Sequence, residues 1–161
     1  MPVEYDSPYQ KLWDAGIGNP AASVVVEVGL NDGRGISRLK TRFPQARIFG
    51  IDEHQRTPDY KTSFDELASS LRGVATLMIE RSPLPFAWPF AYDFCAIDIG
   101  SDPDNNFANI QYWLKYKKPE GVLAMVVPRS TPERLERKER LVQRLQEAGI
   151  SYREVFNWFV F

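Results

Sequence analysis

The sequence predicts a doubly wound α/β fold, in which a mostly parallel sheet carries helices on both faces within a single compact domain. Apolar, β-branched runs recur along the 161 residues. Several runs are continuously apolar, as is typical of strands that are covered on both faces. Segments with helical spacing of apolar residues separate these runs. Because strands alternate with helices, right-handed crossovers and a parallel sheet are favoured.

Five apolar runs are expected to form the strands of this sheet, and each is followed by a more polar segment. The runs are "ASVVVEVGL" (22–30), "ARIFGIDE" (46–53), "ATLMIER" (75–81), "YDFCAID" (92–98) and "GVLAMVV" (121–127). Helices are expected between them over 33–43, 63–72 and 106–118. The connection "SPLPFAWPFA" (82–91) holds three prolines, so it is not expected to form a full helix.

A long helix is predicted near the carboxyl end, over "TPERLERKERLVQRLQEAG". Thr131 is its expected N-cap, Pro132 its first residue and Gly149 its stop. Acidic residues alternate with its arginines, which favours a solvated surface over a phosphate-binding face. The apolar end "YREVFNWFVF" then needs burial, as a last strand, as a short strand pair or against a second subunit. Burial within the chain is favoured.

The predicted domain has three parts in order. Residues 1–20 form an N-terminal helical segment, 22–127 the ligand-binding core, and 131–161 the C-terminal helix and last strand. The lone Cys95 excludes an intramolecular disulfide and is expected to be a small buried core residue.

Charge and hydropathy exclude some partners. The formal net charge is −1 and the pI about 5.9, which gives no electrostatic case for nucleic acid or an anionic membrane. No apolar run approaches the roughly 18 residues that span a bilayer. The first residues lack the pattern of a secretory signal, so a cytoplasmic location is expected.

A glycine-rich turn follows the first predicted strand, in "SVVVEVGLNDGRGIS". Ligands of open α/β sheets bind beyond the carboxyl ends of the strands, where free N–H groups at the start of a helix attract anionic groups. Asp52, at the end of the second predicted strand, is suited to accept hydrogen bonds from both hydroxyls of a ribose. Asn31 stands where dinucleotide-binding turns have their second glycine. A pyrophosphate would be crowded there, whereas a nucleoside with a small amino-acid tail fits better.

Four segments together resemble the class I S-adenosylmethionine-dependent methyltransferases. They are "VVEVGLNDGRGIS", "ARIFGIDEH", "ERSPLPFAWPFAYDFCAID" and "KYKKPEGVLAMVV", and the resemblance covers roughly 22–127. Within that family the sequence is most similar to small bacterial O-methyltransferases. The resemblance implies a Rossmann-like fold, S-adenosyl-L-methionine as cofactor, and methyl transfer to oxygen or nitrogen of a small-molecule acceptor.

The resemblance also implies which residues hold the methionine tail. Glu27 would order the turn and lie near the methionine amino group, while Gly29 and Asn31 would line the methionine portion. Gly33, in the same turn, is counted among the cofactor-binding residues. An alternative for Glu27 is a buried charge paired to its own helix, since an unpaired buried acid is costly.

Further residues are implied for the nucleoside. Asp52 would hold the ribose, and Glu80 would meet the adenine amino group with Arg81 beside it. The alternatives are that Asp52 caps its strand and that Glu80 is a solvent-facing strand end.

Asp98 ends the fourth predicted strand, next to the methyl group in the family, and is the candidate catalytic residue. The alternative is that Asp98, with Asp102 and Asp104, forms a turn and caps the next helix. No metal site is expected, because Val127 and Pro128 stand where metal-binding side chains would be needed. Asp98, even with Asp102, makes a poor magnesium cage.

Other features leave the function open. His54 is either a base or a ring beside the cofactor or at the surface. Tyr9, Trp13 and the aromatics of "PFAWPF" form a small lid or, alternatively, core or dimer contacts, and a homodimer is possible. Besides a methyltransferase, a catalytically silent methyltransferase-fold binding or interaction protein and a nucleotide-dependent enzyme of another Rossmann type remain as alternatives.

Overall fold

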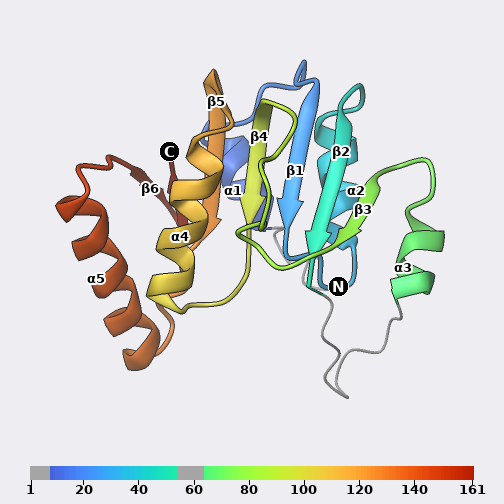
Figure 1. Ribbon diagram of the computed structural model, residues 1–161. Helices are drawn as coiled ribbons and strands as arrows, with labels where there is room; N and C mark the ends of the chain where they lie inside the picture. The colour runs from blue at the N-terminus through green and yellow to red at the C-terminus, as the bar shows by residue number, and fades with distance from the viewer. Residues whose placement is uncertain (1–7, 54–63) are drawn as a thin grey trace, which may run out of the picture.

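A computed structural model describes residues 8–53 and 64–161 of the chain. Its centre is a seven-stranded sheet in the order β3-β2-β1-β4-β5-β7-β6 (Figure 1). The first five strands run parallel, and β7 is antiparallel to both of its neighbours. The strands are β1 (Val24–Val28), β2 (Arg47–Asp52), β3 (Thr76–Ile79), β4 (Tyr92–Ile97), β5 (Lys117–Val126), β6 (Arg153–Val155) and β7 (Trp158–Val160). The prediction of a mostly parallel, doubly wound sheet is confirmed.

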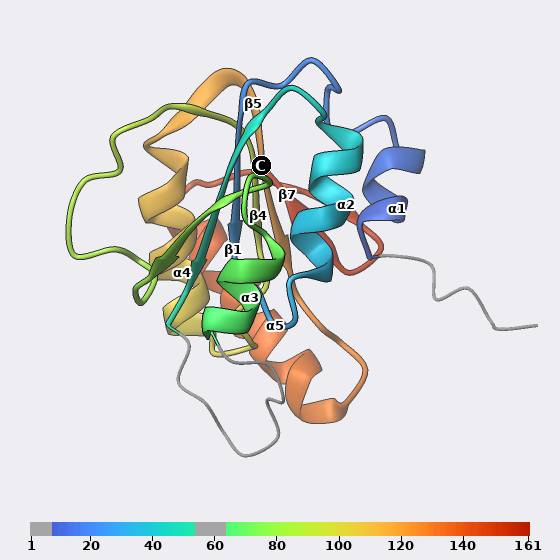
Figure 2. The same cartoon turned by 90° about the vertical axis from the view of Figure 1, so that its right-hand side faces the viewer.

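Helices cover both faces of this sheet (Figure 2), and each face has its own apolar core. One face carries three helices, α1 (Pro8–Asp14), α2 (Arg34–Arg42) and α3 (Phe64–Ser70). The other carries α4 (Pro103–Leu114), α5 (Pro132–Glu147) and the proline-rich connection between β3 and β4. That connection forms no helix among the described residues, as its prolines predict.

The β1 strand lies between β2 and β4, at the middle of the sheet. Val25 and Val26 are fully buried and belong to the cores of opposite faces. This explains why the run is continuously apolar instead of alternating. Cys95 on the neighbouring β4 is also fully buried, as expected.

The boundaries of α4 and β5 differ most from the sequence-based expectation. The α4 helix begins at Pro103, because the Asp102 side chain caps it by accepting a hydrogen bond from the Asp104 N–H. It ends at Leu114, and β5 begins at Lys117, four residues before the predicted start. Lys117 pairs with Tyr92, and the ladder resumes after a register shift between Tyr92 and Phe94. The helical spacing across 115–118 therefore did not reflect a helix.

The two ends of the described chain meet beside β5. The β6 and β7 strands form a hairpin whose Trp158 and Phe159 are buried, so the apolar end is covered within the chain as a short strand pair. Trp158 Nε1 donates a hydrogen bond of 2.8 Å to the Pro8 carbonyl oxygen at the start of α1. Of the aromatics considered for a lid, Tyr9 and Trp88 are core residues. Among the described helices, none is long and apolar enough to cross a membrane.

Candidate functional site

The glycine turn joins β1 to α2 at the carboxyl edge of the sheet. Gly29 and Asn31 both have positive φ angles, of 87° and 50°. A Cβ atom built on Gly29 would overlap the carbonyl oxygen of Asp98 at the end of β4. The turn therefore passes against the end of β4, and only glycine fits at this position.

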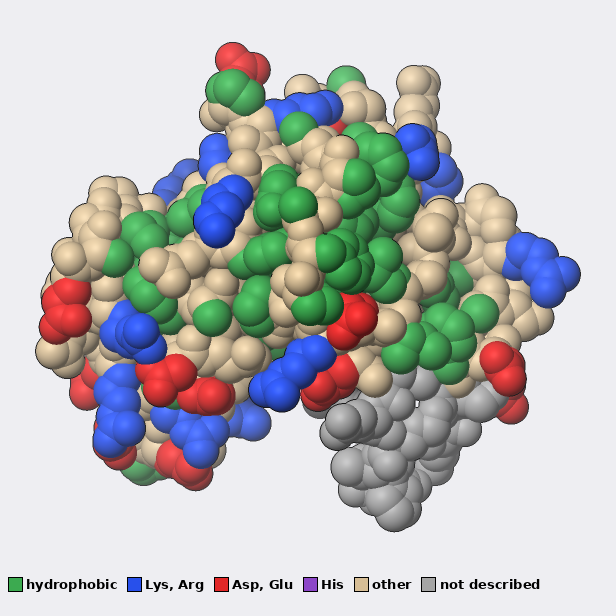
Figure 3. Space-filling model, in the orientation of Figure 1, with side chains coloured by type: hydrophobic (Ala, Val, Ile, Leu, Met, Phe, Trp, Pro, Cys, Tyr) green, Lys and Arg blue, Asp and Glu red, His purple; other side chains and the backbone are tan. Residues whose placement is uncertain are grey.

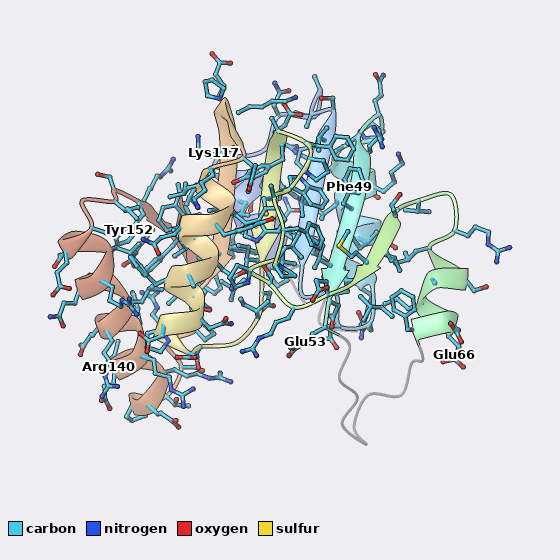
Figure 4. The ribbon with its side chains drawn as sticks, in the orientation of Figure 1. Phe49, Glu53, Glu66, Lys117, Arg140 and Tyr152 are labelled. Carbon is cyan, nitrogen blue, oxygen red and sulfur yellow. The ribbon has the colours of Figure 1, made fainter. Side chains whose placement is uncertain are left out.

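A cavity of about 430 Å³ opens at this edge, beyond the ends of β1, β2 and β4. In the strand order, β1 is the strand from which the chain winds in both directions, which is where open α/β sheets bind ligands. Figure 3 shows acidic and basic side chains close together at the lower edge of the sheet, below a hydrophobic surface. Glu53, which also lines the cavity, lies at this edge just beyond β2 in Figure 4.

The structure brings six of the eight predicted site residues into this one cavity. They come from separate segments of the chain and are Gly29, Asn31, Asp52, Glu80, Arg81 and Asp98. Their roles remain predictions, but their convergence means that one bound molecule would reach all of them.

Asp52 connects the end of β2 to the glycine turn. Its Oδ2 accepts a hydrogen bond of 2.7 Å from the Leu30 N–H, and its carbonyl oxygen accepts one of 3.1 Å from the Glu80 N–H. The Glu80 side chain is half-buried at the cavity wall, and its Oε1 accepts from the Arg81 N–H at 2.9 Å. The carboxylates of Asp52 and Glu80 are thus held by the backbone next to the cavity.

A second cavity, of about 460 Å³, lies on the other side of the turn. It shares Gly29, Asn31 and Asp98 with the first, and it adds Glu27 as well as side chains from α1, α2 and β7. The two cavities therefore adjoin at the glycine turn, where Asp98 lines both, and we refer to them together as the crevice.

Glu27 is the most unusual group of the second cavity, because its side chain is only 4% exposed. Burial raises its pKa to about 8; a hydrogen bond from the Tyr9 hydroxyl lowers the pKa, and the charges of Asp98, Asp32 and Asp52 raise it. The expected alternative, a pairing of Glu27 with its own helix, does not describe this partner, which belongs to α1.

Asp98 is exposed at the mouth of the crevice, and its carboxylate has no hydrogen-bond partner among the described side chains and backbone. Partial desolvation raises its pKa above the ordinary value. The capping role considered for this acidic stretch falls to Asp102, and Asp104 pairs with Arg144. Asp98 is thus left facing the crevice.

Gly33 lines neither cavity. It precedes α2, and a Cβ built on it would overlap the Leu67 side chain of α3. Its close packing against α3 explains the glycine without a ligand, and its assignment to cofactor binding remains a prediction.

Sequence reasoning missed several residues of the crevice. Ser82 and Asn105 line the first cavity, and Arg38 and Trp158 line the second. The spacing of Arg38 on α2, one turn after Arg34, was a usable signal, since both side chains face back toward the glycine turn. No local signal pointed to Trp158, because its position depends on pairing of β7 with β5.

The described residues contain no group of three or more His, Cys, Asp or Glu side chains arranged to hold a metal ion. His54, considered as a base, lies outside the described residues.

Comparison with known proteins places the fold. No family model matches the sequence, and no curated protein matches it. Among solved structures, fibrillarin from Aeropyrum pernix with natively bound S-adenosyl-L-methionine matches with a TM-score of 0.62 at 16% identity, over 93% of this chain and 70% of that one. A fibrillarin in complex with Nop5p matches with a TM-score of 0.63 at 14% identity, over 98% and 80%.

A SAM-dependent O-methyltransferase from Thermotoga maritima gives a TM-score of 0.60 at 16% identity, over 87% of this chain and 49% of that one. Identities this low show the fold and nothing finer. The chain has the fold of the class I S-adenosylmethionine-dependent methyltransferases, with its single mostly parallel sheet. The fold expected from the sequence resemblance is confirmed.

Proposed function

We propose that the protein is an S-adenosyl-L-methionine-dependent methyltransferase that acts on oxygen or nitrogen of a small molecule. The observation that carries the proposal is the convergence of six predicted residues from separate segments on one cavity at the carboxyl edge of the sheet. The fold alone hosts many activities. We favour this activity because one cavity of the crevice has groups suited to a nucleoside and the other has groups suited to an amino-acid tail.

The first cavity suits the adenosine part of the cofactor. Asp52, fixed by its bond to the Leu30 N–H, presents a carboxylate to the ribose hydroxyls. Glu80 and Arg81 stand at the far wall, where the adenine amino group is expected. Asn31, in a left-handed conformation, lines this cavity at the position where dinucleotide-binding turns have their second glycine.

The second cavity suits a zwitterionic amino-acid tail. Glu27 offers a buried acid to an ammonium group, and Arg38 offers a guanidinium to a carboxylate. Arg38 is half-buried and has no hydrogen bond or ion pair with any described residue. By contrast, Arg34 is paired with Asp32. The residues present therefore fit both charged groups of the cofactor's amino-acid tail.

When bound, this cofactor supplies an activated methyl group on a sulfonium. The protein then needs to position the acceptor and keep water away. Asp98, at the junction of the two cavities, is the side chain that we assign to orient the acceptor and take its proton. Its raised pKa favours proton uptake compared with an ordinary aspartate. No metal-assisted step is included in this proposal.

The small-molecule acceptor is supported by the charge balance of the chain, which is −1 overall. Nucleic-acid recognition depends on clustered basic charge, and the acids on α5 neutralise its arginines, as in the pairs Glu133–Arg137 and Glu136–Arg140. Because solved neighbours include a fibrillarin in complex with Nop5p, a protein partner is included in the tests below.

We also propose that the chain is a single functional domain, with 1–20, 22–127 and 131–161 as its parts, and that it acts in the cytoplasm.

Titration calorimetry with S-adenosylhomocysteine and with NAD tests the cofactor. We expect micromolar binding of the former and none of the latter. Asp52→Asn should weaken binding by about tenfold or more, since a hydrogen bond to a charged group contributes about 1.5–3 kcal/mol. Asp65→Asn, an exposed change on α3 outside both cavities, is the matched control. Preference for NAD would overturn the proposal.

Activity is tested separately by following S-adenosylhomocysteine release with a panel of small hydroxyl and amine acceptors. Turnover that is lost in Asp98→Asn, with cofactor affinity retained, supports the assignment of Asp98. Cofactor binding without turnover on the panel, on RNA or with a protein partner favours the alternative of a catalytically silent binding protein.

A further inference from the structure

Tyr9 occupies a position that packing alone does not explain. Its ring lies at the start of α1, and its hydroxyl donates a hydrogen bond to Glu27 Oε2 on β1. Both side chains are buried, with exposed fractions of 7% and 4%, and both line the second cavity. A tyrosine hydroxyl that only needed a partner would be satisfied by a backbone carbonyl, as Tyr92 is by Trp113.

The Tyr9 ring is held from two sides. It stacks on Trp13 at a centroid distance of 5.6 Å and on Trp158 at 5.5 Å. Trp158 in turn is fixed by its hydrogen bond to the Pro8 carbonyl oxygen. Helix α1 and strand β7, from opposite ends of the chain, thus fix the direction in which the hydroxyl points.

The Glu27 carboxyl group is confined on its other side as well. A Cβ at Gly35, in the first turn of α2, would overlap the carboxyl oxygens of Glu27. The carboxyl group is therefore enclosed between Tyr9 and the backbone of Gly35, and the remaining direction is the cavity.

We propose that Tyr9 is a positioning residue, which holds the Glu27 carboxyl group toward the cavity so that it recognises the ammonium group of an amino-acid-tailed ligand. The inference rests on the proposed function, and it adds a requirement: helix α1 has to be docked against β7 before the tail is recognised. Tyr9 itself makes no bond to the reacting atoms.

The charged and titratable groups around Glu27 make the proposal measurable. Besides Tyr9 of α1 they are Asp32 of the turn, Asp52 of β2, Cys95 of β4, Asp98 just after β4, and Arg34 and Arg38 of α2. The aspartates favour the protonated form of Glu27, whereas the Tyr9 hydroxyl favours the carboxylate. Loss of the hydroxyl should therefore make ammonium binding start at higher pH.

The test compares Tyr9→Phe with the unchanged protein, using two probes. S-adenosylhomocysteine carries the ammonium-bearing tail, and 5′-methylthioadenosine lacks it. We expect Tyr9→Phe to weaken binding of the first about tenfold at neutral pH, to move the midpoint of its pH profile upward, and to leave the second unchanged. Tyr152→Phe is the matched control, because Tyr152 packs on Phe159 and lines neither cavity. In Figure 4 it lies away from Glu53.

Each outcome distinguishes the positioning role of Tyr9 from a purely structural role and from failure of the proposed function. Equal affinity and an unmoved pH profile in Tyr9→Phe overturn the positioning role while leaving the proposed function intact. Equal weakening of both probes identifies a purely structural role and also overturns it. If the unchanged protein binds neither probe, the proposed function fails and this inference fails with it. Thermal unfolding of both variants shows whether the fold survives.

Discussion

The α-carbon of Gly29 faces the carbonyl oxygen of Asp98 so closely that no Cβ fits between them. This contact joins the end of β1 to the end of β4, and both residues line both cavities. It also makes the glycine turn sensitive to the smallest substitution.

Gly29→Ala should destabilise the fold by about 3 kcal/mol. A positive φ costs an alanine about 1–2 kcal/mol, and overlap with a backbone oxygen that cannot rotate away adds about 1–3 kcal/mol. Gly73→Ala is the control, because Gly73 has a φ of 77° but open space around its Cβ position. Urea unfolding measures both. Equal losses in the two variants would show that the contact with Asp98 adds nothing.

Glu27 should make stability fall as pH rises. Its pKa is about 8 in the folded protein and about 4.5 in the unfolded chain, so the folded state binds the extra proton between these values. The stabilisation is complete below about pH 4.5 and declines by up to about 1.4 kcal/mol per pH unit until about pH 8. In Glu27→Gln, the free energy of unfolding measured across this range should depend less on pH. Glu139→Gln, exposed on α5, should keep the slope.

Asp93 lies near the start of β4, at the opposite edge of the sheet from the glycine turn. In contrast to Glu27, it should make stability fall as pH falls. Burial raises its pKa, but hydrogen bonds from Val24, Lys118 and Ser23 outweigh burial and hold the pKa at about 2, below the ordinary 3.8. The stabilisation is present above about pH 3.8 and is lost as pH falls toward about 2.

Because Asp93 is partly exposed, we expect Asp93→Asn to cost about 1–2 kcal/mol at neutral pH and to reduce acid sensitivity. Affinity for S-adenosylhomocysteine should not change, since Asp93 lines neither cavity of the crevice. A loss of affinity at full stability would indicate that this end of the sheet communicates with the crevice.

The sheet was predictable because each strand can be recognised from the residues of its own segment. Val25 and Val26 face opposite cores, and such continuous apolar runs need no long-range information to be recognised. The boundary between α4 and β5 was not predictable in the same way. Strand β5 begins at Lys117 because Lys117 pairs with Tyr92 ahead of a register shift in the pairing of β4 with β5, which helical spacing in the sequence does not reveal.

The candidate site was likewise predictable in one part and not in the other. Asp52 ends β2 and Asp98 directly follows β4, so their convergence on the first cavity follows from the parallel topology. The second cavity was harder to predict from the sequence, because Tyr9 and Trp158, which line it, come from opposite ends of the described chain. Tyr9 was noted only as part of a lid or core, and its bond to Glu27 depends on the docking of α1 against β7.

Arg38 provides the last prediction, a test of the second cavity that is independent of Glu27. Its guanidinium has no bond to a described residue and lines the cavity proposed for the amino-acid tail. Arg38→Gln should therefore weaken S-adenosylhomocysteine binding about tenfold or more, because a charge-assisted bond to the tail carboxylate is lost. Binding of decarboxylated S-adenosylmethionine, which keeps the ammonium but lacks the carboxylate, should not change. Arg72→Gln, exposed after α3, is the matched control, and equal weakening of both ligands by Arg38→Gln would show that Arg38 does not read the carboxylate.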